Sequence, residues 1–231
     1  MVQMTPEKII LRVKFKKLGS LQYISHLDLV RTMHKVIVRS GLPLWYTEGF
    51  NPKPKMVFAA PLSIGTESVC EFMDLRLSRR IDPEWAKSCL NANMTSEMQV
   101  TEAYYPESKF TDLKWLSYTI LIKTDGVGEE LAKSCESALN APTIEILKNT
   151  KSGEALVDIR PLVKNTFVTV EGDSLRVSCL LPADPSSFLN PEYAVKVLRE
   201  KCGILSSPDL TSEYYSIMRE RAYLEDMSEF K

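Results

Sequence analysis

Residues 23–68 read YISHLDLVRTMHKVIVRSGLPLWYTEGFNPKPKMVFAAPLSIGTES. Ser25 followed three residues later by Asp28 is typical of a helix N-terminus, and Gly41 is typical of a helix end. These signals predict a helix over residues 25–40. At about 100° per residue its predicted buried side comprises Leu27, Val30, Met33, His34, Ile37 and Val38. A basic stripe on the opposite flank comprises Arg31, Lys35 and Arg39.

Strand patterns lie on both sides of this helix. Alternating apolar and basic residues predict a strand over residues 8–17, with a polar face formed by Arg12, Lys14 and Lys16. After the helix we expect strands at 42–47, 56–60, 68–77 and 97–105, and a helix that begins at the Asp82-Pro83-Glu84 signal. The order is that of the ferredoxin-like β-α-β-β-α-β unit, with one hairpin strand added.

The second half repeats this order of elements. We expect strands at 115–123, 143–149, 155–159, 167–170, 175–181 and 212–223, and helices at 129–139 and 190–202. The predicted fold class is therefore α+β, with two ferredoxin-like units built on antiparallel sheets. The predicted domains are residues 1–108 and residues 109–231.

Charge is distributed unevenly between these halves. The 231 residues carry 29 Lys+Arg and 30 Asp+Glu, a net of −1, which excludes a histone-like tail and an acidic disordered protein. Residues 1–55 hold 10 basic and 3 acidic residues, a net of +7, and residues 56–231 hold 19 and 27, a net of −8. The basic front end indicates a local anion site in the N-terminal domain, beside an acidic C-terminal domain.

Several classes of protein are not favoured by the sequence. It has no apolar run of 18 residues, and its start lacks the apolar core of a signal peptide. The five cysteines lie at least 19 residues apart, which argues against a zinc ribbon, an iron–sulfur cluster and a disulfide scaffold. We expect a cytoplasmic protein with no membrane partner and no metal or cofactor of its own.

The most distinctive segment is the loop EGFNPKPK, residues 48–55. Its two prolines stiffen the backbone, and Asn51 tolerates a turn conformation. Lys53 and Lys55 bring two cations and Phe50 offers a stacking face, a combination that suits a phosphate backbone with an unstacked base. A plain turn with solvated lysines is the alternative, and the sequence leaves both open.

Histidine and acidic residues supply the other candidates. His26, at the helix start, could act as a general acid or base or donate a hydrogen bond to a phosphate. His34 is predicted to be a core histidine, and Asp28 to stabilise the helix dipole. Asp158 and Arg160 alternate along a predicted strand, so they either pair with each other or leave Arg160 to reach a ligand. No nucleophile elbow, phosphate-binding glycine loop or metalloprotease helix occurs.

Residues 23–68 resemble the start of the radical SAM-linked protein family, bacterial proteins found alone or fused behind a radical S-adenosylmethionine domain. The family's usual EGFNPHPR is EGFNPKPK here, with Lys53 in place of histidine and Lys55 in place of arginine. Positive charge is kept, while imidazole chemistry at position 53 is not. The DIRP segment at residues 158–161 is similar to the family's second half. The resemblance implies a radical SAM protein as partner, acting on RNA or the translation apparatus; this chain has no C-x-x-x-C-x-x-C motif for the cluster.

Three functional hypotheses follow from these observations. The leading one is a non-catalytic RNA-binding or substrate-presenting accessory module that works with a radical SAM enzyme. Its predicted binding residues are Arg31, Lys35, Arg39, Phe50, Asn51, Lys53, Lys55 and Arg160. The alternatives are a metal-independent RNA-processing or modifying enzyme that uses His26, and a protein-interaction subunit that contacts its partner through the acidic second domain.

Overall fold

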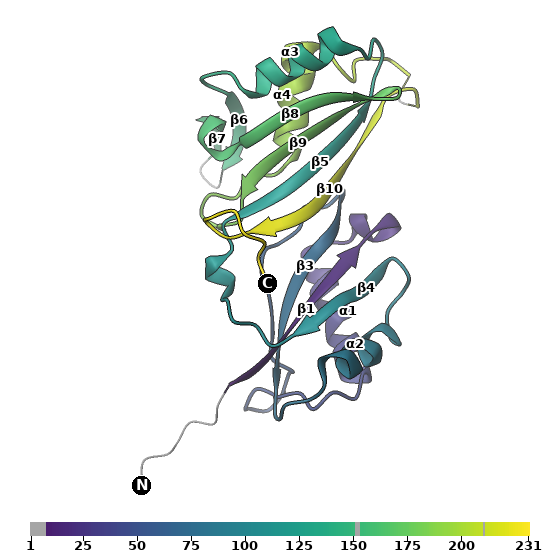
Figure 1. Cartoon of the computed structure of the whole chain (residues 1–231), viewed down its shortest axis with the longest axis vertical. Coiled ribbons are helices and arrows are strands. Elements are labelled where there is room, and N and C mark those ends of the chain that lie inside the picture. Colours follow the sequence, from purple (N-terminus) through teal and green to yellow (C-terminus); the bar gives the residue numbers. More distant parts are fainter. Residues whose placement is uncertain (1–7, 151–152, 210) are drawn as a thin grey trace. The chain divides into compact units, whose positions relative to one another are not determined.

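The computed structural model describes residues 8–150, 153–209 and 211–231 (Figure 1). It is a mixed α+β structure with antiparallel sheets, and the described residues form four α-helices. The chain divides into two compact units, one ending at Asp112 and the other spanning Leu113–Phe230, whereas the sequence placed the boundary after residue 108. None of the helices in the described ranges is both long enough and apolar enough to cross a membrane.

The first unit contains, from residue 8 onward, four strands and two α-helices. They are β1 (Ile9–Lys17), α1 (His26–Arg39), β2 (Met56–Phe58), β3 (Thr66–Leu77), α2 (Pro83–Asn91) and β4 (Met98–Tyr104), with short 3-10 turns η1 (Gly19–Tyr23) and η2 (Phe110–Asp112). The strands lie in the order β4-β1-β3, and β2 pairs with β3. Each of these pairs is antiparallel.

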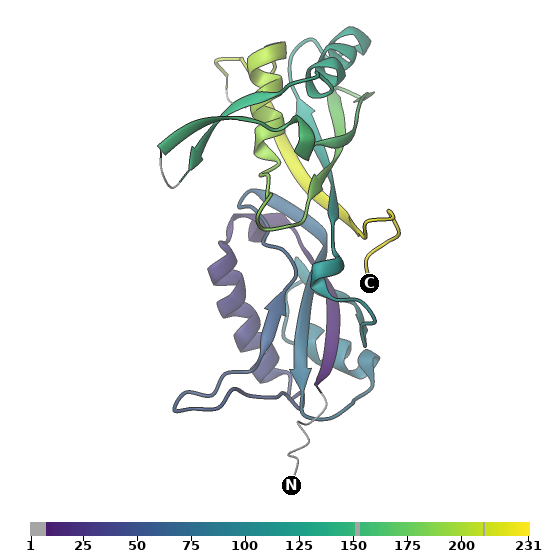
Figure 2. The same ribbon diagram turned by 90° about the vertical axis from the view of Figure 1, so that its left-hand side faces the viewer.

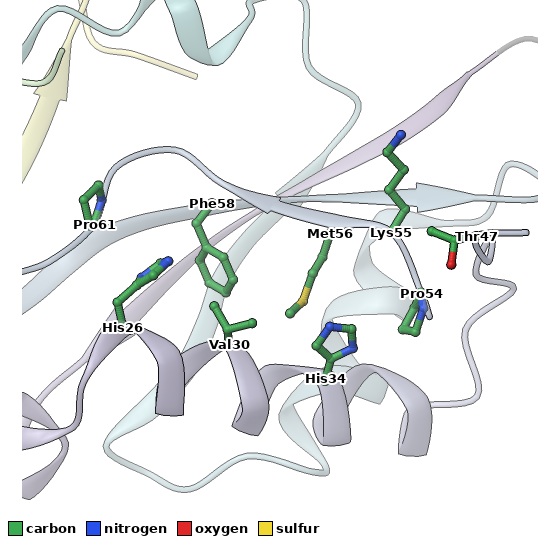
Figure 3. Close-up of a pocket in the computed structure, with 9 residues that line it drawn as sticks. All are labelled: His26, Val30, His34, Thr47, Pro54, Lys55, Met56, Phe58 and Pro61. Carbon is green, nitrogen blue, oxygen red and sulfur yellow. The ribbon is translucent and has the colours of Figure 1, made fainter. Parts of the chain in front are cut away.

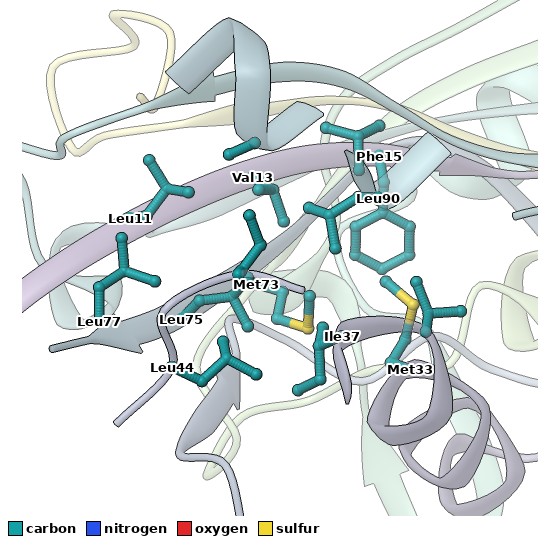
Figure 4. Packing of buried hydrophobic residues seen from close by; sticks show 14 of the residues in the cluster. Leu11, Val13, Phe15, Met33, Ile37, Leu44, Met73, Leu75, Leu77 and Leu90 are labelled. Atoms are coloured by element: carbon teal, nitrogen blue, oxygen red, sulfur yellow. The ribbon is translucent and has the colours of Figure 1, made fainter. Parts of the chain in front are cut away.

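One hydrophobic core joins this sheet to both helices (Figure 4). Alternate residues of β1 point to the same face of the sheet, and Leu11, Val13 and Phe15 are fully buried there. Met33 and Ile37 of α1 and Leu90 of α2 pack against this face. The sheet and the core side of α1 therefore fix how the rest of α1 is presented.

The buried face of α1 differs from the predicted one. Leu27 and Val38 were expected inside, but they are 56% and 53% exposed. The buried residues are Leu29, Met33, Val36 and Ile37. The reason is that apolar residues extend around more than half of this helix, so helical period alone does not decide which of them the sheet covers.

Residues 42–47 were expected to form a strand but make only isolated bridges. Leu44 pairs with Leu77, and Tyr46 pairs with Pro54. Pro43 and Pro54 have no N–H to donate, and the two bridges lead to different partners, so no continuous ladder forms. The segment instead leads into a narrow projecting loop, residues 45–55 (Figure 2).

The polar face predicted for the first strand is partly enclosed. Arg12 is only 1% exposed, and its guanidinium donates to both carboxylate oxygens of Asp74, at 2.7 and 3.0 Å. The same group lies 4.3 Å above the centre of the Phe110 ring and donates to the Ser108 hydroxyl. Burial raises the pKa of Asp74, while the hydrogen bonds and charge of Arg12 act in the opposite direction. Lys17 is also buried, so part of the basic front end is not exposed to an anion.

In the part of it that the structure describes, the second unit has six strands and two α-helices. Its elements are β5 (Trp115–Lys123), α3 (Glu129–Leu139), β6 (Glu145–Thr150), β7 (Gly153–Asp158), β8 (Lys164–Glu171), β9 (Ser174–Pro182), α4 (Glu192–Cys202) and β10 (Tyr214–Tyr223), with the 3-10 turn η3 (Arg160–Leu162). Strands β10-β5-β9-β8 form one antiparallel arrangement, and β6 and β7 form a separate hairpin. Gly203 ends α4 with φ of 69°, which explains the glycine at that position.

Replacing Asp74 by Ala should lower the free energy of unfolding by about 3 kcal/mol, because the buried Arg12 guanidinium would lose its two hydrogen bonds to the Asp74 carboxylate. Denaturant unfolding followed by circular dichroism measures this change. The matched control is Glu102→Ala, which removes an exposed carboxylate 3.2 Å from Lys14 and should cost less than about 1 kcal/mol. Equal destabilisation of the two variants would contradict the role given to the buried pair.

Candidate functional site

The start of α1 is fixed by a reciprocal cap. The Ser25 hydroxyl oxygen accepts the N–H of Asp28 at 3.1 Å and donates its own proton to the Asp28 carboxylate at 2.7 Å. The Ser25 hydroxyl, and then Arg31 at 3.1 Å, lower the pKa of Asp28. His26 is thereby placed as the first residue of the helix, with its side chain exposed.

A groove runs along one face of α1. His26, Val30 and His34 follow each other at four-residue intervals, so they lie on the same face of the helix. Figure 3 shows all three pointing toward the segment that leads into β2. The groove has a volume of about 510 Å³, and its lining comes from the first unit alone.

The opposite wall is formed by residues 54–58. Pro54, Met56 and Phe58 point toward α1 in Figure 3, and Lys55 between them points away, as the two-residue period of an extended chain requires. The rings of His26 and Phe58 meet edge to face, with centroids 5.4 Å apart and planes at 79°. Thr47 and Pro61 complete the lining. The interior of the groove is therefore apolar and aromatic, with an imidazole toward each end.

His34 lies in this groove and not in the core, which corrects the prediction for this residue. Its side chain is half-buried. Burial lowers the pKa of His34, and the positive charge of Lys53 lowers it further. The four-residue spacing from His26 through Val30 to His34 was visible in the sequence and could have identified this face.

Backbone hydrogen bonds hold the base of the loop. The Lys53 carbonyl accepts the N–H of Thr47 at 2.9 Å, and the Thr47 hydroxyl accepts the N–H of Lys53 at 3.0 Å. The N–H of Lys55 donates to the Trp45 carbonyl at 3.1 Å. Gly49 has φ of 120°, a conformation that favours glycine at the turn. The loop is thus a braced projection that sets the position of Lys53 and Lys55.

Two cationic side chains lie over the ring of Trp45 at the base of the loop. The guanidinium carbon of Arg76 lies 3.9 Å from the ring centroid, and the ammonium of Lys55 lies 5.9 Å from it. Arg76 also donates its backbone N–H to the Lys55 carbonyl at 3.0 Å. Arg76 was not among the predicted site residues, because its place next to the loop arises from β3, about twenty residues further along the chain.

The structure brings only part of the predicted binding set into the groove. His26 and Lys55 are among its lining residues. Arg31, Lys35 and Arg39 are exposed on α1 but do not line it, and Arg31 pairs with Asp28. Phe50, Asn51 and Lys53 are exposed on the loop, with Phe50 entirely in solvent.

Arg160 belongs to the second unit, where its strand prediction was wrong. Strand β7 ends at Asp158, and Arg160 begins the turn η3. The Asp158 carboxylate accepts the backbone N–H groups of Arg160 and Ile144, at 2.9 and 2.8 Å, and these bonds, that of Arg160 first, lower the pKa of Asp158. The Arg160 guanidinium donates to the Val163 carbonyl at 2.5 Å. These bonds form a local cap at the end of β7, and ligand binding by Arg160 stays a prediction.

The titratable side chains in the groove lining are two imidazoles, of His26 and His34, and the ammonium of Lys55. Within the described ranges, no group of three or more His, Cys, Asp or Glu side chains is placed to hold a metal ion. His26 and His34 are eight residues apart, which is about 12 Å along a helix. That separation does not suit a general acid and a general base acting on one phosphate at hydrogen-bond distance.

A family model described as "Uncharacterized protein conserved in bacteria (DUF2344)" matches residues 11–191. The chain belongs to this family. The match to DUF2344 includes β1, α1 and both walls of the groove, and it extends into the second unit as far as Pro191. A search of curated proteins found no match.

Two solved structures are distantly similar to this DUF2344 chain. A chain in "Crystal Structure of a Cbf5-Nop10-Gar1 Complex" aligns with 92% of this chain and 48% of its own length, at 12% identity and a TM-score of 0.49. This chain therefore spans about half the length of that one. "Crystal Structure of an Unknown Protein from Galdieria sulphuraria" aligns over 92% and 99% of the two chains, at 11% identity and a TM-score of 0.26. TM-scores this low do not establish a shared fold.

Replacing Lys53 by Gln should raise the pKa of His34 toward its ordinary value of about 6.5, because a nearby positive charge is removed. A proton NMR titration of the imidazole measures the shift. In the unmodified chain the lowered pKa means that the folded state binds fewer protons than the unfolded state. The contribution of His34 to stability is therefore fully present above about 6.5, the pKa of the unfolded state, and is lost as the pH falls from there through the lower pKa of the folded state.

The matched control for this titration is Lys133→Gln, which removes an exposed lysine from α3 of the second unit. It should leave the His34 titration unchanged. A Lys53→Gln variant in which the pKa of His34 stayed the same or fell would contradict the proximity of these two side chains.

Proposed function

We propose that this chain is a non-catalytic RNA-binding module that holds single-stranded RNA on its first unit and presents it to a radical SAM enzyme. The observation that carries the proposal is the groove between α1 and β2, with apolar and aromatic walls and exposed cations on α1 and on the loop that precedes β2. Single-stranded RNA offers the matching chemistry, a row of phosphates with bases free to leave the stack.

The exposed cations support the phosphate part of this proposal. The basic stripe of α1, Arg31, Lys35 and Arg39, is exposed, and so are Lys53 and Lys55 of the loop. Because the braced loop needs little further ordering, less of the binding free energy is spent on fixing it. Phe50, fully exposed next to these lysines, supplies a face on which a base can stack.

The radical SAM part of the proposal rests on the family resemblance of residues 23–68. With no cluster-binding cysteine motif in the sequence, the reaction would be carried out by the partner. Co-purification of the tagged chain with a radical SAM protein from a native bacterial host tests this part; repeated recovery of the chain without one would count against it.

We also assign each unit to the ferredoxin-like group of folds. In the first unit the order of elements is β-α-β-β-α-β, with strands in the order β4-β1-β3 and β2 beside β3. In the second unit, β10-β5-β9-β8 repeats this arrangement, with the β6–β7 hairpin inserted after α3. Both patterns agree with a split β-α-β motif.

Binding of a fluorescent oligoribonucleotide should weaken steeply as salt rises, since each phosphate neutralised by a cation contributes about −0.7 to the slope of log K against log salt for a single strand. The double variant Lys53→Gln/Lys55→Gln should weaken binding and make that slope shallower by about 0.7 for each phosphate that is no longer neutralised. Fluorescence anisotropy across a salt series measures both quantities.

The control for this experiment is Lys133→Gln/Lys201→Gln, which removes two exposed lysines from α3 and α4 of the second unit. It should leave affinity and slope close to those of the unmodified chain. Affinity that hardly depends on salt, or equal weakening by the two double variants, would contradict the proposal.

The second candidate function is RNA cleavage or modification with His26 as general acid or base, favoured by the position of His26 in the groove lining. The same RNA samples, resolved on a denaturing gel after incubation, test it. Cleavage that disappears in His26→Ala would replace the non-catalytic proposal, and cleavage that persists would exclude His26 as the responsible group.

A further inference from the structure

The groove walls are apolar over their central part. Val30 from α1 faces Met56 and Phe58 from the opposite wall (Figure 3). A phosphate would lose its hydration there without gaining a counter-charge, so these walls disfavour the RNA backbone itself. A flat ring with two apolar faces matches them better.

The ends of the groove are polar. His26 and His34 point into it, and neither imidazole makes a hydrogen bond to any group in the part of the chain that the structure describes. A neutral imidazole has one donor and one acceptor nitrogen, so both rings can pair with the edge of a heterocycle. The His26 ring is also held edge-on to Phe58, which orients it.

The cations lie outside these walls, where phosphates on either side of a bound base would be. Lys53 is near enough to His34 to influence its protonation, and Lys55 points away from the groove interior in Figure 3. Arg31 and Lys35 lie on the neighbouring, solvent-exposed face of α1. This separation of an apolar interior from a cationic rim is complementary to a nucleotide within a strand.

The geometry points to a base pocket: the groove between α1 and residues 54–58 holds one unpaired nucleobase of an RNA strand. This inference rests on the proposed function and specifies it further. The base lies against Phe58, Met56 and Val30, its polar edge meets the imidazoles, and the flanking phosphates contact the loop and α1 cations. A paired base is excluded, because its edge and both faces are occupied inside a duplex.

The test compares an oligoribonucleotide with a strand of equal length in which every internal base is replaced by an abasic ribose. The phosphates are the same, so the affinity ratio reports the contribution of the bases. Intact RNA should bind at least about fivefold more tightly, as stacking on aromatic side chains predicts.

Val30→Trp fills the groove from the helix side, and Val69→Trp is its matched control, the same substitution in the first unit at an exposed site of β3 outside the groove lining. Val30→Trp should weaken binding of the intact strand by about fivefold or more and leave the abasic strand unchanged. Val69→Trp should change neither. Phe58→Leu keeps an apolar wall but removes the ring, so it should also weaken binding of the intact strand and leave the abasic strand unchanged. It replaces Val30→Trp in the test if that variant does not fold.

The possible results distinguish failure of the base pocket from failure of the proposed RNA binding. If neither strand binds, both fail. If the intact and abasic strands bind equally, or if Val30→Trp and Phe58→Leu weaken both strands by the same factor, the base pocket is overturned while RNA binding stands. If uridine or adenosine monophosphate competes as strongly as the strand, the groove takes free nucleotides and the inference fails.

Discussion

The orientation of α1 on its sheet is the constraint on which the candidate site depends. A helix turns about 100° per residue, so residues four apart share a face and adjacent residues do not. The side of α1 that packs in the core comprises Leu29, Met33, Val36 and Ile37. The side that lines the groove comprises His26, Val30 and His34. The solvent-exposed side comprises Arg31, Lys35 and Arg39. Packing of the first face against β1 and β3 therefore determines where the other two point. A small rotation of the helix would remove the imidazoles from the groove.

The opposite wall follows from the two-residue period of an extended chain. Pro54, Met56 and Phe58 face α1 and Lys55 faces away, where it meets Trp45 together with Arg76. The hydrogen bonds between Thr47 and Lys53 keep the loop above this wall in one conformation. An apolar interior and a cationic rim thus arise from the same few residues. We propose that this division of chemistry matches the bases and phosphates of RNA.

The sequence predicted local features well where the determining chemistry is itself local. The Ser25 cap placed the start of α1, and Trp115–Lys123 and Glu129–Leu139 were predicted with the bounds that the structure shows. Features that depend on distant residues were missed. Arg12 is buried because Asp74, 62 residues away, pairs with it, and His34 lines a groove whose other wall comes after a long loop. Which apolar residues of α1 would be covered depended likewise on the position of the sheet, which no helical pattern contains.

Photocrosslinking tests the central claim, that RNA lies along α1 and the loop of the first unit, most directly. The full chain would be irradiated with an oligoribonucleotide that carries 4-thiouridine, and the attachment sites identified by mass spectrometry of the digested protein. The account predicts crosslinks within residues 26–58, with Phe50 and Phe58 as expected aromatic sites. Crosslinks confined to Leu113–Phe230 would contradict it.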